Sequence, residues 1–134
     1  MINDKIIKIA SKTQNAGLKN VFTHKSFVKN SSCGDIIKVE FVVDNLKIKS
    51  MRYETESCVL CEASASLFSS KIKNYYVKDL KKDIDNIKKM KKNKKIIIPS
   101  KFKEFKILLN NKTLSRFNCV ILPMEAFLKA FRLS

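Results

Sequence analysis

The stretch Asp35-Ile-Ile-Lys-Val-Glu-Phe-Val-Val-Asp-Asn-Leu-Lys-Ile-Lys-Ser-Met-Arg-Tyr53 decides the fold. Between residues 35 and 44, apolar side chains alternate with charged ones, which is the two-residue period of a half-buried strand. A turn signal follows at residues 44–45, and the alternation resumes over residues 46–53. The pattern therefore predicts two antiparallel strands joined as a hairpin.

The segments around this hairpin add one edge strand and several helices. We expect the edge strand within residues 20–29, and helices that have apolar residues at three- and four-residue spacing. The expected helices cover residues 2–12, the segment after Cys58, residues 75–95, residues 100–109 and the segment from Pro123 onward. These elements predict one α+β domain over residues 1–134, with a lysine-rich helical insert at about residues 75–110.

The chain is strongly basic, with 28 Lys and Arg against 12 Asp and Glu and a formal charge of +16. Such a charge attracts polyanions without specificity. Only three of the basic residues are Arg, the side chain best suited to bidentate contacts with phosphate and bases. A nucleic acid is therefore not expected as a specific partner.

Apolar runs in the sequence are short. None approaches the roughly 18 to 20 residues that a membrane span requires. The first five residues, Met-Ile-Asn-Asp-Lys, lack the charged-then-apolar layout of a secretory signal. We therefore expect a cytoplasmic protein that has no membrane partner.

Three cysteines and one aspartate are candidate metal ligands. Cys33 and Asp35 lie two residues apart, so on an extended strand they point to one face, and Gly34 leaves the space between them open. Cys58 lies at a strand-to-helix junction, where free N–H groups and the helix dipole favour thiolate. Cys119 is expected in a short loop before the last helix. Three thiolates and one carboxylate form a candidate tetrahedral Zn²⁺ site.

Simpler interpretations exist for each of these residues. Cys-Gly-Asp also describes an ordinary turn. Cys58 and Cys61 form a CxxC pair, which is typical of redox sites and of half a zinc site, but no second CxxC is present. We expect Cys61 to be a packed thiol one helical turn beyond Cys58. His24, the only histidine, is expected at the surface.

Three blocks together resemble the NifU/IscU family of iron–sulfur cluster assembly proteins. They are Cys33-Gly-Asp35 before a strand, Cys58-Val-Leu-Cys-Glu-Ala-Ser-Ala-Ser66 and Ser115-Arg-Phe-Asn-Cys-Val-Ile-Leu-Pro123. The 61-residue gap from Cys58 to Cys119 is similar to that of the SufU-like branch. The residue before the third cysteine is Asn118, whereas IscU proteins have histidine there.

The resemblance implies a small antiparallel sheet of about three strands, with helices packed on one face. It implies zinc held by Cys33, Asp35, Cys58 and Cys119. It further implies that Cys33 accepts persulfide sulfur from a SufS-type, pyridoxal-phosphate-dependent cysteine desulfurase and passes it to downstream acceptors. Arg116 is a candidate for steering an anionic partner or stabilising a thiolate, although it could equally be a solvated charge.

Two other functions remain open. The same ligands could hold a transient [2Fe–2S] cluster, which would make the chain a scaffold that passes clusters to other proteins. Alternatively, the chain could be a structural zinc module that binds polyanions through its lysine-rich helix.

The sequence departs from the family pattern at two loops. The family's Gly-x-Gly before the second cysteine is replaced by Glu54-Thr-Glu-Ser57, so that turn must form without glycine. The family's N-terminal Pro-x-Asn motif survives only as Thr13-Gln-Asn-Ala-Gly17. Both changes affect the expected loop geometry and leave the four candidate ligands in place.

Overall fold

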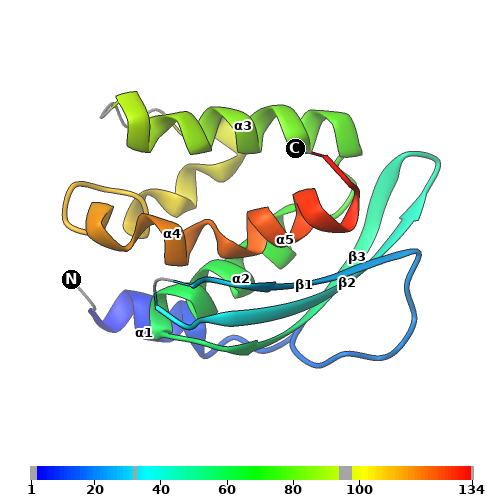
Figure 1. The fold of residues 1–134 in the computed structure, drawn as a ribbon, viewed down its shortest axis with the longest axis horizontal. Coiled ribbons are helices and arrows are strands. Elements are labelled where there is room, and N and C mark those ends of the chain that lie inside the picture. Colours follow the sequence, from blue (N-terminus) through cyan, green and yellow to red (C-terminus); the bar gives the residue numbers. More distant parts are fainter. Residues whose placement is uncertain (1–2, 32, 94–97, 134) are drawn as a thin grey trace.

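The computed structural model describes residues 3–31, 33–93 and 98–133. Within these residues, three antiparallel strands form one sheet in the order β1-β2-β3, and helices are layered over one of its faces (Figure 1). The strands are β1 (His24–Lys29), β2 (Ile36–Asp44) and β3 (Lys47–Glu56). The α-helices are α1 (Asp4–Ala10), α2 (Val59–Lys71), α3 (Val77–Asn93), α4 (Phe117–Val120) and α5 (Leu122–Ala130). The predicted α+β class with a small antiparallel sheet is confirmed. The expected helix ends at Ile2 and Lys95 lie outside the described residues.

The predicted hairpin is present, but its turn is displaced. Asp44 pairs with Lys47, so the loop consists of Asn45 and Leu46, and both have positive φ angles of 53° and 67°. Positive φ at both central residues gives the twist that a two-residue hairpin requires. Leu46, expected to begin the second strand, is instead 75% exposed in this turn.

The inner face of the sheet carries the core. Ile37, Val39 and Phe41 alternate along β2 and are almost fully buried. Helices α2 and α5 cover this face, and the Phe127 ring of α5 meets the Phe41 ring edge-on, with centroids 5.7 Å apart. The small residues of α2 at positions 63–66 are all buried, as expected for close packing of a helix on a sheet.

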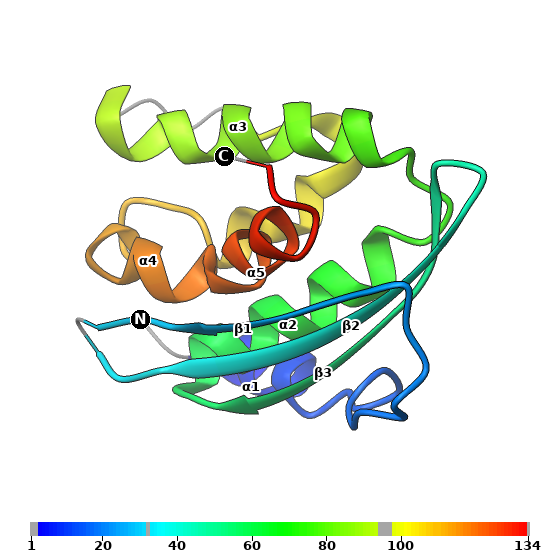
Figure 2. The ribbon, with the colours of Figure 1, turned by 45° about the vertical axis from the view of Figure 1, so that its right-hand side comes forward.

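Helix α3 forms an outer layer above α4 and α5 (Figure 2). Its apolar residues Leu80, Ile84 and Ile87 are fully buried, which confirms the predicted amphipathic helix. The helical segment expected after Pro99 is present as a 3₁₀ helix, η1 (Ser100–Ile107). A shorter 3₁₀ turn, η2 (Leu114–Arg116), leads into α4. Among the described residues, no helix combines the length and the apolar composition that a bilayer crossing requires.

The outer face of the sheet fixes the segment between α1 and β1. Glu40 is only 6% exposed, and its Oε1 accepts hydrogen bonds from the backbone N–H groups of Lys19 and Asn20 at 2.9 and 3.1 Å. Arg52, opposite Glu40 on β3, donates to backbone carbonyls of residues 14–17. This charged pair therefore holds the chain that replaces the family's N-terminal motif.

Candidate metal centre

Cys33 lies in the tight connection between β1 and β2. The Gly34 amide donates to the Asn30 carbonyl at 2.7 Å, and the Asn30 amide donates to the Asp35 carbonyl at 2.8 Å. Gly34 has φ +78°, and an added Cβ would meet nothing within 4 Å. Glycine is therefore favoured by the backbone conformation and not by a need for space. The expectation that Cys33 and Asp35 share an extended strand is wrong, because β2 begins only at Ile36.

Cys58 is the N-cap residue of α2, at the predicted strand-to-helix junction. Its backbone N–H donates to Asp35 Oδ1 at 3.1 Å, and its thiol donates to Asp35 Oδ2 at 3.3 Å. Asp35 is only 5% exposed, so these bonds satisfy a carboxylate that burial would otherwise destabilise. The start of α2 is thus joined directly to the Cys33 loop.

Cys119 completes the cluster from α4, a short helix where the sequence predicted a loop. Its Sγ lies 3.4 Å from Cys33 Sγ. The ligand atoms of Cys33, Asp35 and Cys119 lie within 4.8 Å of one another, the only such group of three among the described residues. Burial raises the pKa of Cys119 to about 12; a hydrogen bond from Arg116 opposes this rise and the Cys33 thiol adds to it.

The donor set and its spacing fit a Zn²⁺ ion. With Zn–S near 2.3 Å and Zn–O near 2.1 Å, neighbouring ligands of a tetrahedral zinc are about 3.6–3.8 Å apart. The Cys33–Cys119 sulfur distance of 3.4 Å and the Cys58–Asp35 distance of 3.3 Å are both close to this value. Cys58 lies outside this group of three, but its thiol is hydrogen-bonded to Asp35, a member of the group.

Arg116 lies beside the cluster. Its hydrogen bond with the Cys119 sulfur, and the negative charge that Cys58 and Cys119 would carry, raise the pKa of the guanidinium. The sequence offers three roles for Arg116, namely steering an anionic partner, stabilising a thiolate or a solvated charge, and its role stays a prediction. The neighbouring Asn118 side chain accepts a hydrogen bond from Lys91 of α3 at 3.4 Å and so points toward the outer layer.

The remaining cysteine and the histidine lie away from the cluster. Cys61 is fully buried, as predicted, and burial strongly raises its pKa, so it is poorly suited to redox pairing with Cys58. His24 is partly buried at the start of β1 and stacks on the Phe131 ring at 4.1 Å. It begins the strand whose other end leads to Cys33, so it is not a candidate ligand.

One residue that positions the site was missed by sequence reasoning. The buried Ser64 hydroxyl of α2 donates to the Val120 carbonyl of α4. This bond fixes α4, and with it Cys119, onto the helix that begins at Cys58. The only sequence signal was the run of small residues at positions 63–66, which indicates close packing but no particular partner.

Fold and site together define a small α+β protein with three thiols and one carboxylate gathered at one end of its sheet. The family model of the NifU-like N-terminal domain matches residues 1–107. The chain belongs to this family, whose members act in iron–sulfur cluster assembly. The match ends before Arg116 and Cys119. It is therefore the structure, and not the family model, that places Cys119 beside Cys33.

Solved structures of similar fold agree with this assignment. A NifU-like protein (N-terminal) from Brucella abortus has a TM-score of 0.85 at 18% identity, covering 97% of this chain and 91% of its own. A candidate iron–sulfur cluster assembly scaffold protein for the SUF system from Fervidobacterium islandicum AW-1 has a TM-score of 0.80 at 20% identity, with 96% and 95% covered. No curated protein matches the sequence significantly.

Proposed function

We propose that this chain is a cytoplasmic, zinc-dependent sulfur acceptor of the SufU-like branch. It takes persulfide sulfur from a SufS-type cysteine desulfurase and supplies it to iron–sulfur cluster assembly or to another thiolation pathway. Two features support this branch: the long spacing between Cys58 and Cys119, and Asn118 in place of a histidine beside the third thiol. The resulting donor set of Cys33, Asp35, Cys58 and Cys119 contains no imidazole.

The observation that carries the proposal is the contrast between two neighbouring thiols. Cys33 is exposed, whereas Cys119, 3.4 Å away, is buried. A partner's persulfide can therefore reach Cys33 without any opening of the core. The three buried or half-buried groups behind it are suited to remain in place while Cys33 reacts.

The transfer is an exchange between sulfur atoms that needs no external oxidant. The Cys33 thiolate attacks the terminal sulfur of the desulfurase persulfide and forms a new S–S bond. The S–S bond of the donor breaks, and the desulfurase cysteine leaves as a thiolate. A bound zinc would favour the thiolate forms of Cys58 and Cys119 and keep the loops ordered.

Asp35 and Arg116 have distinct roles in this scheme. Asp35 orients Cys58 through its backbone and thiol hydrogen bonds, and as a hard oxygen ligand it keeps the metal set exchangeable. Arg116 places positive charge beside Cys119. There it stabilises the negative charge of the remaining thiolates once Cys33 has left the ligand set to react.

A scaffold function is the second candidate, favoured by the family and by the Fervidobacterium neighbour described as a scaffold. In this case a [2Fe–2S] cluster is the cargo, assembled on the same four residues and released to an acceptor protein. The two functions differ in what the isolated protein carries and in whether Cys33 acquires sulfur.

The deciding experiment combines metal analysis with a desulfurase assay. The purified chain is expected to contain about one zinc, to accelerate a SufS-type desulfurase and to gain one sulfur atom on Cys33 by mass spectrometry. Cys33→Ala is expected to abolish the acceleration of the desulfurase and the gain of sulfur. Cys61→Ala, which removes a thiol from the core, is expected to preserve both. Bound iron and inorganic sulfide would replace this proposal by the scaffold function, and an inert, metal-free protein would contradict both.

A further inference from the structure

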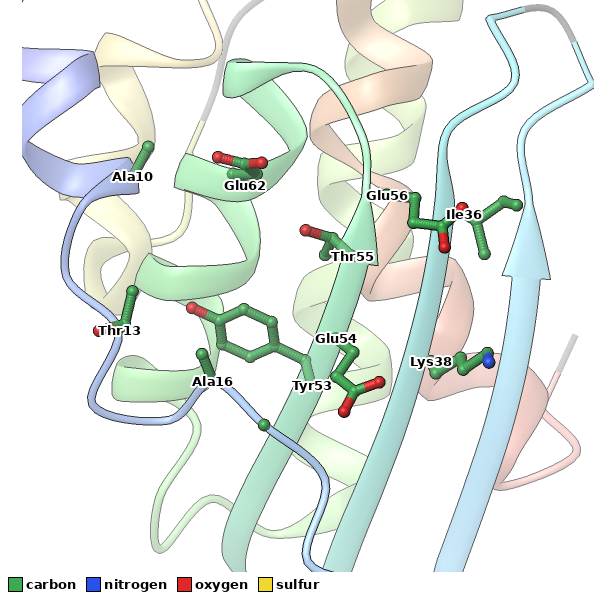
Figure 3. Close-up of a pocket in the computed structure, with 11 residues that line it drawn as sticks. Ala10, Thr13, Ala16, Ile36, Lys38, Tyr53, Glu54, Thr55, Glu56 and Glu62 are labelled. Atoms are coloured by element: carbon green, nitrogen blue, oxygen red, sulfur yellow. The ribbon is translucent and has the colours of Figure 1, made fainter.

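A cavity of about 440 Å³ lies beside the edge of β3, bordered by the end of α1 and the first turn of α2 (Figure 3). None of the four candidate ligands lines it. Two of its lining residues are nevertheless close to them in the sequence, because Ile36 follows Asp35 and Glu56 precedes Cys58 by two residues. The cavity is therefore adjacent to the candidate metal centre and separate from it.

The edge of β3 is paired only in part. The Tyr53 amide donates to the Asn15 carbonyl at 3.2 Å, and the Tyr53 carbonyl accepts from the Gly17 amide at 2.7 Å. This short parallel bridge ends there, because the chain turns away across the outer face of the sheet after Gly17.

The next edge position along β3 is Thr55. The β2–β3 register is regular from Tyr53 to Thr55, so the alternation of an antiparallel ladder directs the Thr55 N–H and C=O away from β2, as it does those of Tyr53. Within the described residues, no backbone group of this chain bonds to Thr55 on that side. Thr55 lines the cavity, which therefore contains an open strand edge.

The cavity is acidic in a strongly basic protein. Glu54, Glu56 and Glu62 line it, against the single cation Lys38. Glu54 accepts a hydrogen bond from the Leu18 amide at 3.4 Å. The side-chain carboxylates of Glu56 and Glu62 make no hydrogen bond or ion pair with any described residue. Among the described residues, the three carboxylates do not form a group close enough to hold one metal ion.

We propose that this cavity binds an extended, basic segment of a partner protein by strand addition to β3. The main chain of this segment pairs with Thr55, the first edge position beyond the bridge formed by residues 15–17. Its Lys or Arg side chains contact Glu56 and Glu62. The main-chain bonds give affinity for any extended peptide, and the carboxylates select a basic one.

The test measures binding of a defined probe to the full chain at physiological salt. The probe is a fluorescein-labelled ten-residue peptide of alternating Lys and Val, followed by fluorescence anisotropy. Two comparison peptides have alternating Glu and Val, or Lys and Val with every backbone nitrogen methylated. The Lys–Val peptide is expected to bind although the chain carries a charge of +16. The methylated peptide should bind about tenfold more weakly, a loss of about 1.4 kcal/mol, because it lacks main-chain N–H donors on both of its edges.

Variants of the cavity separate its two components. Thr55→Pro removes the outward N–H without removing a β2–β3 ladder bond, a position at which edge strands tolerate proline. The double variant Glu56→Lys with Glu62→Lys reverses the charge. Each is expected to weaken the Lys–Val peptide about tenfold, while Asp79→Lys, a charge reversal at an exposed position on α3, changes binding less than twofold.

Several outcomes would overturn the proposal. One is a Lys–Val peptide that does not bind, or that binds the double variant and the wild type equally. Equal binding of the methylated and unmethylated peptides would show that charge alone acts and that no strand is added. Because those peptides are compared on the unmodified protein, the test does not depend on how well Thr55→Pro folds. Desulfurase stimulation is not part of the readout, so the proposed function can fail while this one stands.

Discussion

Helix α3 and the thiol-bearing end of the sheet differ in what holds their side chains in place. In α3, three fully buried residues at helical spacing, Leu80, Ile84 and Ile87, fix the orientation of the helix. Lys78, Lys82 and Lys89 of the same helix are exposed. At the thiol-bearing end of the sheet, individual hydrogen bonds hold the side chains in place, including the two from Cys58 to Asp35. The first region depends on packing, whereas the second depends on a few directed bonds. A substitution that disrupts one of these two regions should therefore leave the structure of the other largely unchanged.

The largest effect is expected from Ile84→Ala in α3. Removing a fully buried isoleucine side chain leaves a cavity, and such changes lower the free energy of unfolding by about 2–5 kcal/mol. Urea unfolding of the metal-free protein measures this change. Zinc affinity of the folded variant should equal that of the wild type. A stability loss below about 1 kcal/mol would mean that α3 contributes little to the core.

Asp35→Ala is expected to do the opposite, lowering the affinity for zinc and leaving the packing of α3 unchanged. If a structural zinc site contributes about 10–16 kcal/mol through four ligands, one ligand accounts for roughly 3 kcal/mol, or about 100-fold in affinity. The variant also leaves the Cys58 amide without its acceptor. Competition with a chromogenic chelator measures the affinity of the folded protein for zinc.

The matched control removes a carboxylate from the other region. Asp85→Ala breaks only the partly exposed ion pair with Lys81 on α3, at 2.6 Å, and such pairs contribute about 0–1 kcal/mol. Its zinc affinity should be that of the wild type. If both variants lost zinc to the same extent, the effect would be one of general stability, and Asp35 would not be a ligand.

The same contrast explains which parts of the structure were predictable. The alternation along β2 and the helical period of α3 each follow from burying one face, so residue type alone revealed them. The turn lies one residue later than the Asp44-Asn45 signal predicts, because Leu46 adopts a positive φ of 67°, which is uncommon for such a residue. A β-bulge between Val42 and Val43 also shifts the register. No periodic pattern in the sequence indicates such a bulge.

The candidate site was predictable in composition but not in geometry. Residue types at the ends of predicted elements suggest the four candidate ligands, and the family resemblance implies the same set. No local rule, however, brings Cys33 next to Cys119, 86 residues away. The sequence predicts a loop where the short helix α4 lies, because a four-residue helix has no visible period. The bond from Ser64 to Val120 depends on how two helices meet, which spacing alone does not encode.

An intermediate effect is expected from alkaline pH on the metal-free protein. Burial raises the pKa of Cys61 above its ordinary value of 9.0. A thiol whose pKa is raised by folding contributes stability that is fully present below pH 9 and is lost as the pH rises beyond it. From pH 8 to pH 10, Cys61 should therefore cost about 1 kcal/mol of unfolding free energy. Urea unfolding at both pH values should show a smaller difference in Cys61→Ala, and an identical difference would contradict the assignment.

The smallest effect on stability is expected at the lysine face of α3. Lys78, Lys82 and Lys89 are exposed and make no ion pair with a described residue. Replacing all three with Gln should change the unfolding free energy by less than about 0.5 kcal/mol per site. Retention on heparin should weaken, because fewer counterions are released on binding. Desulfurase stimulation should stay at the wild-type level if the lysine face serves only solubility. A parallel loss of stimulation would instead show that the desulfurase, or an acidic partner, docks on α3, and the two regions would then share one function.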